Sequence, residues 1–271
     1  RAEAVDRVGA LTVPTIRDEE WRFTDLSPLT RQTFQPVRSR DLRAVVDTGP
    51  FDVREATSRL VFVDGVYAPE LSRVVANGAV VANLGAADAA QGEIVDRHLG
   101  RYVEFRANVF AALNTAFVHD GALIVVPPGA TVTAPIHLLF VAREQDTASY
   151  PRCLVAAGRG SAATIIEDFV SLTDGAYFTD AVTEVVLAED ARLDHVRVQR
   201  ESGQAFHIGN GAASLAAGSR FQSVSVTLGA RLSRYSLVLD LAAADLKEGV
   251  VAQHRLVAGL VGVAPVALLP A

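Results

Sequence analysis

The chain has 271 residues, of which 50% are hydrophobic and 21% are charged, and its formal net charge is −6. This composition excludes a disordered protein, because the chain has enough apolar surface to offset the conformational entropy lost on folding. A mildly acidic chain has no bulk attraction for nucleic acid or for an anionic membrane surface, so we expect neither as a partner.

The single cysteine, Cys153, excludes an internal disulfide bond, and one thiol cannot hold an iron–sulfur cluster alone. Residues 1–15 lack the apolar core of a signal peptide. The uncharged run 256–271 is shorter than a membrane span and contains Pro265, so we expect no membrane anchor. Together these features predict a cytoplasmic protein.

The first third of the chain mixes short helices with short strands. Acidic residues 18–20 predict a helix start, because carboxylates suit the positive end of a helix. Residues 60–67 predict a hairpin, with the turn at an Asp-Gly pair, and residues 80–84 predict another short strand. Residues 102–117 carry apolar side chains at helical spacing and predict a helix.

A rough repeat of strands follows from residue 122 to residue 241. Gly129, Gly160, Asp190 and Gly218 each lie in a turn between two strand runs, and they are 31, 30 and 28 residues apart. A repeat of this length made only of strands predicts stacked coils, as in a parallel β-helix or solenoid. An antiparallel sandwich or jelly roll is the alternative, because alternation and turn spacing do not fix strand direction. The expected runs are 123–126, 136–141, 164–170, 183–187, 193–199, 221–228 and 235–241.

These patterns predict a mostly β protein in three parts. A smaller helical and mixed N-terminal domain is expected over residues 1–118, and a partial β-helix core over 119–241. Residues 242–271 form an atypical segment that we do not expect to continue the repeat, with helical spacing over 242–259. The glycines of 158–163 predict a tight turn rather than a phosphate-binding loop, since the lysine of that loop is missing.

Few residues suggest chemistry. His195 and His207 lie on neighbouring strand runs and could approach each other, which makes them, with Cys153, weak candidates for metal ligands. A structural role is favoured for each of the three. Glu167 and Asp168 are adjacent on a strand and point to opposite faces, so they cannot act as one acid–base pair. We therefore expect no catalytic residues and no enzyme activity.

Five longer motifs, in order, resemble the SufB/SufD family of the SUF iron–sulfur cluster assembly system. They are EEWRFTDLSPL (19–29), LVFVDGVYAPELS (60–72), FAALNTAFVHDGALIVVPPGATVTAPIHLLF (110–140), YFTDAVTEVVLAEDARLDHVRVQRES (177–202) and VTLGARLSRYSLVLDL (226–241). The block around Trp21 resembles the SufD branch. Residues 167–169 read Glu-Asp-Phe where the SufB branch usually has a cysteine after an acidic-glycine step, which also fits SufD.

The resemblance implies an N-terminal helical domain, a right-handed parallel β-helix core and a C-terminal helical domain. It implies a scaffold that pairs with a SufB-like subunit, works with a SufC-like ATPase, and has no active site of its own. A homodimer is also expected when the SufB-like subunit is absent. The resemblance implies that this chain binds no cofactor alone and shares an iron–sulfur cluster with its partner.

Residues 242–271 depart from the family, because they match neither the end of the core nor the domain that docks the SufC-like ATPase. We therefore expect this chain to be incomplete at its C-terminus and not to bind that ATPase. The family's functional residues have no matching positions here, and the sequence assigns neither cluster ligands nor a flavin site. Two alternatives stay open, a β-helix carbohydrate-active enzyme and a structural solenoid without a metal role.

Overall fold

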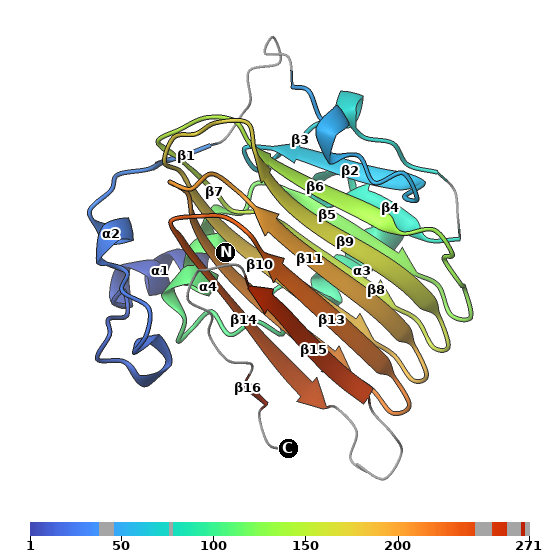
Figure 1. The fold of residues 1–271 in the computed structure, drawn as a ribbon. Coiled ribbons are helices and arrows are strands. Elements are labelled where there is room, and N and C mark those ends of the chain that lie inside the picture. Colours follow the sequence, from blue (N-terminus) through green and yellow to red (C-terminus); the bar gives the residue numbers. More distant parts are fainter. Residues whose placement is uncertain (38–45, 76–77, 242–250, 259–266, 269–271) are drawn as a thin grey trace.

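Two stacked β-sheets dominate the structure, a computed structural model that describes residues 1–37, 46–75, 78–241, 251–258 and 267–268 (Figure 1). One sheet has nine strands and the other has seven. The strands of the nine-stranded sheet are β1 (Gln35–Pro36), β4 (Val80–Asn83), β5 (Gly121–Val126), β7 (Thr147–Ser149), β8 (Arg152–Ala157), β10 (Phe178–Leu187), β12 (Phe206–Leu215), β14 (Leu232–Leu241) and β16 (Ala267–Leu268). Those of the seven-stranded sheet are β2 (Ser58–Val63), β3 (Val66–Tyr67), β6 (Ile136–Ala142), β9 (Ala162–Ser171), β11 (Arg192–Arg200), β13 (Arg220–Thr227) and β15 (Val251–Ala258).

From β8 onward the chain alternates between the two sheets, and each strand pairs in parallel with the strand two places further along. This pattern is a parallel β-helix of about 4 turns, so the predicted fold class is confirmed. The antiparallel sandwich is wrong. Among the described strands, the antiparallel pairs join β2 to β3 and β4 to β5, in the first half of the chain.

The repeated turns follow from backbone conformation. Gly129, Gly160, Asp190 and Gly218 all have positive φ, between 59° and 72°. The turns also stack, because the Gly160 amide donates to Glu189 O at 2.9 Å and the Asp190 amide donates to Ala217 O at 3.0 Å. The predicted tight turn at 158–163 is therefore confirmed, and it forms one step of this stack.

An aromatic ladder fills part of the space between the sheets. Phe62, Phe140 and Phe169 occupy paired positions on β2, β6 and β9, and their rings stack with centroids 5.2 and 4.8 Å apart. Side chains from successive coils lie directly above one another because parallel in-register pairing repeats the same face every coil. The coil repeat in the sequence therefore becomes a continuous core.

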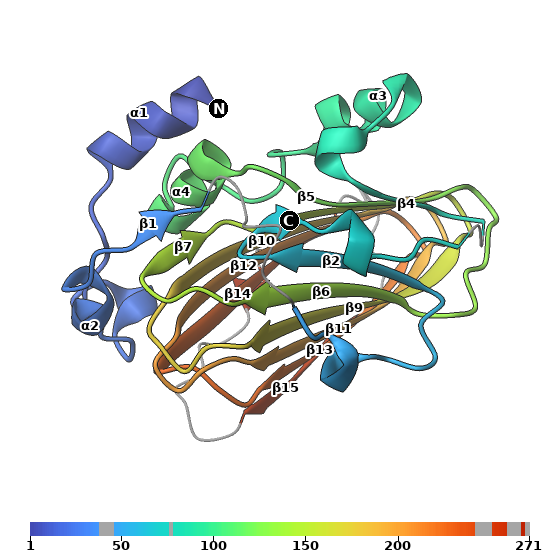
Figure 2. The ribbon, with the colours of Figure 1, turned by 90° about the horizontal axis from the view of Figure 1, so that it is seen from above.

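Helices cover the outer face of the nine-stranded sheet (Figure 2). They are α1 (Ala2–Ala10), α2 (Ser27–Thr30), α3 (Ala89–His98) and α4 (Val109–Phe117). Single-turn 3-10 helices lie at Glu19–Trp21, Gly49–Phe51, Pro69–Leu71 and Leu84–Ala86, and Phe51 and Leu71 of two of them pack on the seven-stranded sheet instead. On α4, the buried Asn114 amide donates to Pro151 O at 2.9 Å and to Asp180 O at 2.7 Å. The Asn114 side chain therefore links α4 by hydrogen bonds to two successive coils of the β-helix. No helix among these described elements is long and apolar enough to cross a membrane.

The hairpin over 60–67 and the strand in 80–84 are confirmed. The helix expected over 102–117 begins only at Val109, because the Asn108 side chain accepts from the amides of Phe110 and Ala111 and caps it. The acidic start at 18–20 gives only the 3-10 helix Glu19–Trp21.

The prediction for the end of the chain needs correction. The helix expected over 242–259 is wrong for residues 251–258, which form β15 and pair in parallel with β13. The expectation that 242–271 do not continue the repeat is wrong for β15 and for β16, which pairs with β14. An unpaired strand edge supplies backbone partners that outweigh local helical spacing. The rest of 242–271 lies outside the described residues.

Candidate functional site

Polar side chains line part of the space inside the β-helix. Seven of these side chains form a set that we call the interior cluster, and none of the seven is more than 7% exposed. They are Cys153 on β8, Glu167 on β9, Thr183 on β10, His195 and Arg197 on β11, Glu201 just after β11, and His207 on β12.

Strand alternation places these residues inside. On β11, Leu193, His195, Arg197 and Gln199 are buried, and each is followed by a more exposed residue. Successive strand residues point to opposite faces, so these four share the inner face. The inner face of β11 is therefore apolar at its start and polar along the rest of the strand.

Glu167 is the centre of one end of the cluster. Its Oε1 accepts a hydrogen bond from Thr183 Oγ1 at 2.7 Å, and its Oε2 lies 3.5 Å from His195 Nε2. Burial alone would raise the pKa of Glu167, but the nearby His195 and the hydrogen bond from Thr183 outweigh burial and lower it. Glu167 therefore stays a carboxylate inside the protein.

Cys153 lies beside that carboxylate and is fully buried. Burial is the main cause that raises the pKa of the Cys153 thiol well above its usual range. The charge of Glu167 and a hydrogen bond to Glu167 raise this pKa further. A protonated thiol is a poor nucleophile and a poor metal ligand.

Arg197 and His207 form the other end of the cluster. The guanidinium of Arg197 lies between two rings, 4.9 Å from the Phe169 centroid and 4.5 Å from the Tyr235 centroid. Its Nη2 hydrogen-bonds to His207 Nε2. Because a guanidinium can only donate, His207 Nε2 accepts and its Nδ1 carries the proton, which it donates to Glu201 Oε2 at 2.5 Å.

These contacts keep His207 neutral. Burial is the main cause that lowers the pKa of His207, and the charge of Arg197 adds to it, while Glu201 opposes both. Glu201 also accepts from Gln199 Nε2 at 2.9 Å and from Thr179 Oγ1 at 3.0 Å. The Arg197 guanidinium therefore lies near two carboxylates, Glu167 and Glu201, and hydrogen bonds through His207 link it to Glu201.

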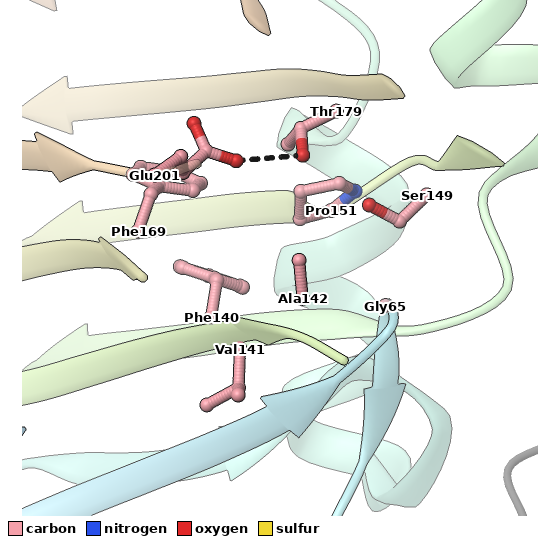
Figure 3. Close-up of a pocket in the computed structure, with 9 residues that line it drawn as sticks. All are labelled: Gly65, Phe140, Val141, Ala142, Ser149, Pro151, Phe169, Thr179 and Glu201. Atoms are coloured by element: carbon pink, nitrogen blue, oxygen red, sulfur yellow. Dashed lines mark hydrogen bonds between the residues drawn. The ribbon is translucent and has the colours of Figure 1, made fainter. Parts of the chain in front are cut away.

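The Glu201 end lies beside a small cavity (Figure 3). Thr179 and Glu201, joined by a hydrogen bond, line it together with Phe169 and Pro151, and the cavity volume is about 10 Å³. This is roughly the space that one water molecule needs. The cluster is therefore closed to anything larger in this conformation.

The structure brings all three candidate metal ligands into this cluster. Cys153 and His195 contact Glu167, and His207 joins through Arg197. Within the described ranges, however, no group of three His, Cys, Asp or Glu side chains is arranged to hold a metal ion. Any role of Cys153, His195 or His207 as ligands in an assembly stays a prediction.

Sequence reasoning missed Arg197 and Glu201. The alternation of polar residues in 193–199, in phase with buried Leu193, was the available signal for Arg197. The opposite facing of Glu167 and Asp168 is confirmed. Asp168 points away from the interior cluster, where it accepts from Arg200 Nε at 3.0 Å and lies 3.6 Å from His137 Nε2.

Two family models match the chain in succession. The SufBD protein N-terminal region matches residues 1–138, and the SufBD core domain of SUF system FeS cluster assembly matches residues 140–252. The chain belongs to the SufB/SufD family. Membership supports a role in iron–sulfur cluster assembly by the SUF system, and the parallel β-helix fits this assignment.

Curated relatives agree with the family assignment. The chain is 34% identical to an iron–sulfur cluster assembly SufBD family protein of Synechocystis over 88% of this chain and 55% of the relative. It is 29% identical to the iron–sulfur cluster assembly protein SufD of Escherichia coli over 84% of this chain and 52% of the relative. A chloroplastic protein of Arabidopsis thaliana is 26% identical over 83% of this chain and 48% of the relative. The chain thus spans about half the length of these relatives.

Proposed function

We propose that this chain is part of a SufD-like scaffold subunit of the SUF system. In this proposal it pairs with a SufB-like subunit, works with a SufC-like ATPase in the cytoplasm, and has no catalytic activity of its own. The nascent iron–sulfur cluster is cargo shared with the SufB-like partner, and this chain binds no cofactor by itself.

The observation that carries the proposal is the succession of the two family models over one continuous β-helix. The likeness to SufD of Escherichia coli supports the SufD branch over the SufB branch. The tripeptide Glu-Asp-Phe at 167–169 supports it too, because it lacks the cysteine that the resemblance implies for the SufB branch after an acidic-glycine step.

The geometry fits a scaffold better than a carbohydrate-active enzyme. Glycoside hydrolysis requires two carboxyl groups flanking a sugar in an open groove. Here Glu167 and Glu201 are 1% and 7% exposed and are held by hydrogen bonds inside the β-helix. Charged groups fixed in this way stiffen a core and do not reach a substrate.

Co-expression tests the proposal. The complete gene product that carries this chain is produced with SufB-like and SufC-like proteins, and the mixture is separated by size exclusion and assayed for iron. We expect one complex that contains all three proteins and retains iron. A matched sample without the gene product is expected to lose most of the iron.

Two outcomes would contradict the proposal. If the gene product elutes alone at every protein concentration, it is not the scaffold partner. If a complex forms but its iron content does not depend on the gene product, the structural solenoid without a metal role is correct. Release of reducing sugar from polysaccharides by the purified protein would favour the enzyme alternative.

A further inference from the structure

A cavity of about 720 Å³ lies on the outer side of the nine-stranded sheet, separate from the interior cluster. Its walls are residues 11–21 and 102–109, and its floor comes from β12 and β14. We call it the arm cavity. Its volume is in the range of cavities that bind small molecules or the side chains of a peptide.

Carboxylates surround this cavity. Asp18, Glu19, Glu20 and Glu104 all line it and are all exposed, whereas Arg234 is the one guanidinium among its lining residues. Among the lining residues, carboxylates therefore outnumber guanidiniums by four to one. Such a surface attracts cations and repels polyanions such as nucleotides or nucleic acid.

The arm cavity already accommodates one guanidinium. Arg234 extends from β14 and stacks on Trp21 with its Cζ 4.0 Å from the ring centroid. Trp21 in turn packs on Phe110 of α4, with centroids 5.5 Å apart, so the ring is fixed in the wall. An aromatic wall with nearby carboxylates favours a cationic side chain over a neutral polar one.

Apolar surface continues along the same segment. Ile16 is 57% exposed and Phe23 is 90% exposed, on either side of the acidic turn. Inside the cavity, Leu11, Val109 and Val238 add apolar lining.

We propose that the arm cavity docks a segment of a partner protein in which basic side chains alternate with apolar ones. The apolar side chains enter the cavity, and the arginine or lysine side chains pair with Glu19 and Glu104 at its edge. The proposal follows from charge and shape alone and does not depend on the role in cluster assembly.

Trp21 provides the assay, since it is the only tryptophan in the sequence and lines the cavity. The probe is a short synthetic peptide of alternating arginine and leucine, titrated into the full chain while tryptophan emission is recorded. We expect a saturable change that weakens as salt is added, because salt screens exposed charges. Matched peptides carry glutamate for arginine, or serine for leucine, and both are expected to bind at least about tenfold more weakly.

Two pairs of variants locate the binding. Ser236→Phe fills the cavity from β14 and is expected to weaken binding about tenfold, whereas Ser214→Phe on β12, outside the cavity, leaves it unchanged. Glu19→Gln with Glu104→Gln is expected to weaken binding about fivefold at low salt, whereas Glu93→Gln with Asp96→Asn on α3 does not.

Three results would overturn the proposal. The first is no saturable change in emission with the wild-type chain. The second is equal binding by the Ser236→Phe variant, which would mean that the peptide adheres elsewhere. The third is equal binding of the glutamate peptide, which would mean that the carboxylates do not select the occupant. Circular dichroism of each variant verifies that it is folded.

Discussion

Arg197 shows how single residues hold the interior together. The residue is 1% exposed, and its guanidinium lies between the Phe169 and Tyr235 rings and hydrogen-bonds to His207. An isolated buried charge would cost several kcal/mol, and only nearby opposite charges and hydrogen bonds offset that cost. Glu167 and Glu201 supply the opposite charges. The members of the interior cluster therefore depend on one another.

This dependence predicts how stability changes with pH. The pKa of His207 is lowered by burial, below its ordinary value of 6.5. Between the lowered pKa and about 6.5 the unfolded chain binds a proton that the folded chain does not, so stability falls as pH falls through this window. We expect the urea midpoint to decrease from about pH 7.5 to about pH 5.5, and His207→Gln to flatten that slope.

His119 provides the control, because it is exposed. The His119→Gln variant is expected to keep the wild-type slope. Glu167, whose pKa is lowered, loses its contribution only below about pH 4.5 and so does not affect this window. A His207→Gln slope equal to that of the wild type would show that folding does not lower the pKa of His207.

At the scale of elements, the turns set the coil repeat. Gly129 has a φ of 72° and Gly160 a φ of 64°, in the left-handed region that glycine adopts without strain. Asp190 adopts the same conformation at the equivalent turn, with a φ of 59°. Aspartate tolerates this region better than most residues, which explains why the repeat survives there without glycine.

Substitutions at two glycines allow the free-energy cost of backbone strain to be measured separately from the cost of packing. An added Cβ would meet nothing within 4 Å at Gly129 or at Gly92. Gly129→Ala is expected to destabilise the protein by about 1–2 kcal/mol, because its φ is positive. Gly92→Ala, in the middle of α3, is expected to stabilise it by about 0.5–1 kcal/mol.

Urea unfolding of both variants measures these free energies. The predicted signs are opposite although neither substitution makes a new close contact. A loss of stability of the same size in both variants would mean that conformation at the turn does not set the cost.

At the scale of the whole molecule, the N-terminal helices and the β-helix share hydrophobic clusters. One cluster joins Ala4 and Ala111 to Val182 and Ala212, and another joins Phe110 to residues of β10 and β12. Arg152 and Glu184 form a buried ion pair at 2.6 Å beneath the helices, and Glu184 also accepts from the Gly100 amide at 2.7 Å. The two parts are therefore expected to unfold together.

Two spectroscopic probes test this expectation. Trp21 fluorescence reports the N-terminal part, and far-ultraviolet circular dichroism reports mainly the strands. We expect their urea transitions to coincide, as in a two-state transition. Asn114→Ala is expected to lower both midpoints together, at a cost of about 1–3 kcal/mol, because it removes two buried hydrogen bonds between α4 and the β-helix. Loss of the Trp21 signal at clearly lower urea would show that the helices dissociate first.

The sequence by itself determined the coil repeat, the turn positions, the hairpin at 60–67 and the opposite facing of Glu167 and Asp168. These features depend on local conformation and on the two-residue period of a strand. The tertiary structure alone decided that Cys153, His195 and His207 share one cluster, and that residues 251–258 form a strand. Side chains from coils about 30 residues apart meet only once parallel pairing fixes their register, and an open strand edge decides the conformation of the segment that pairs with it.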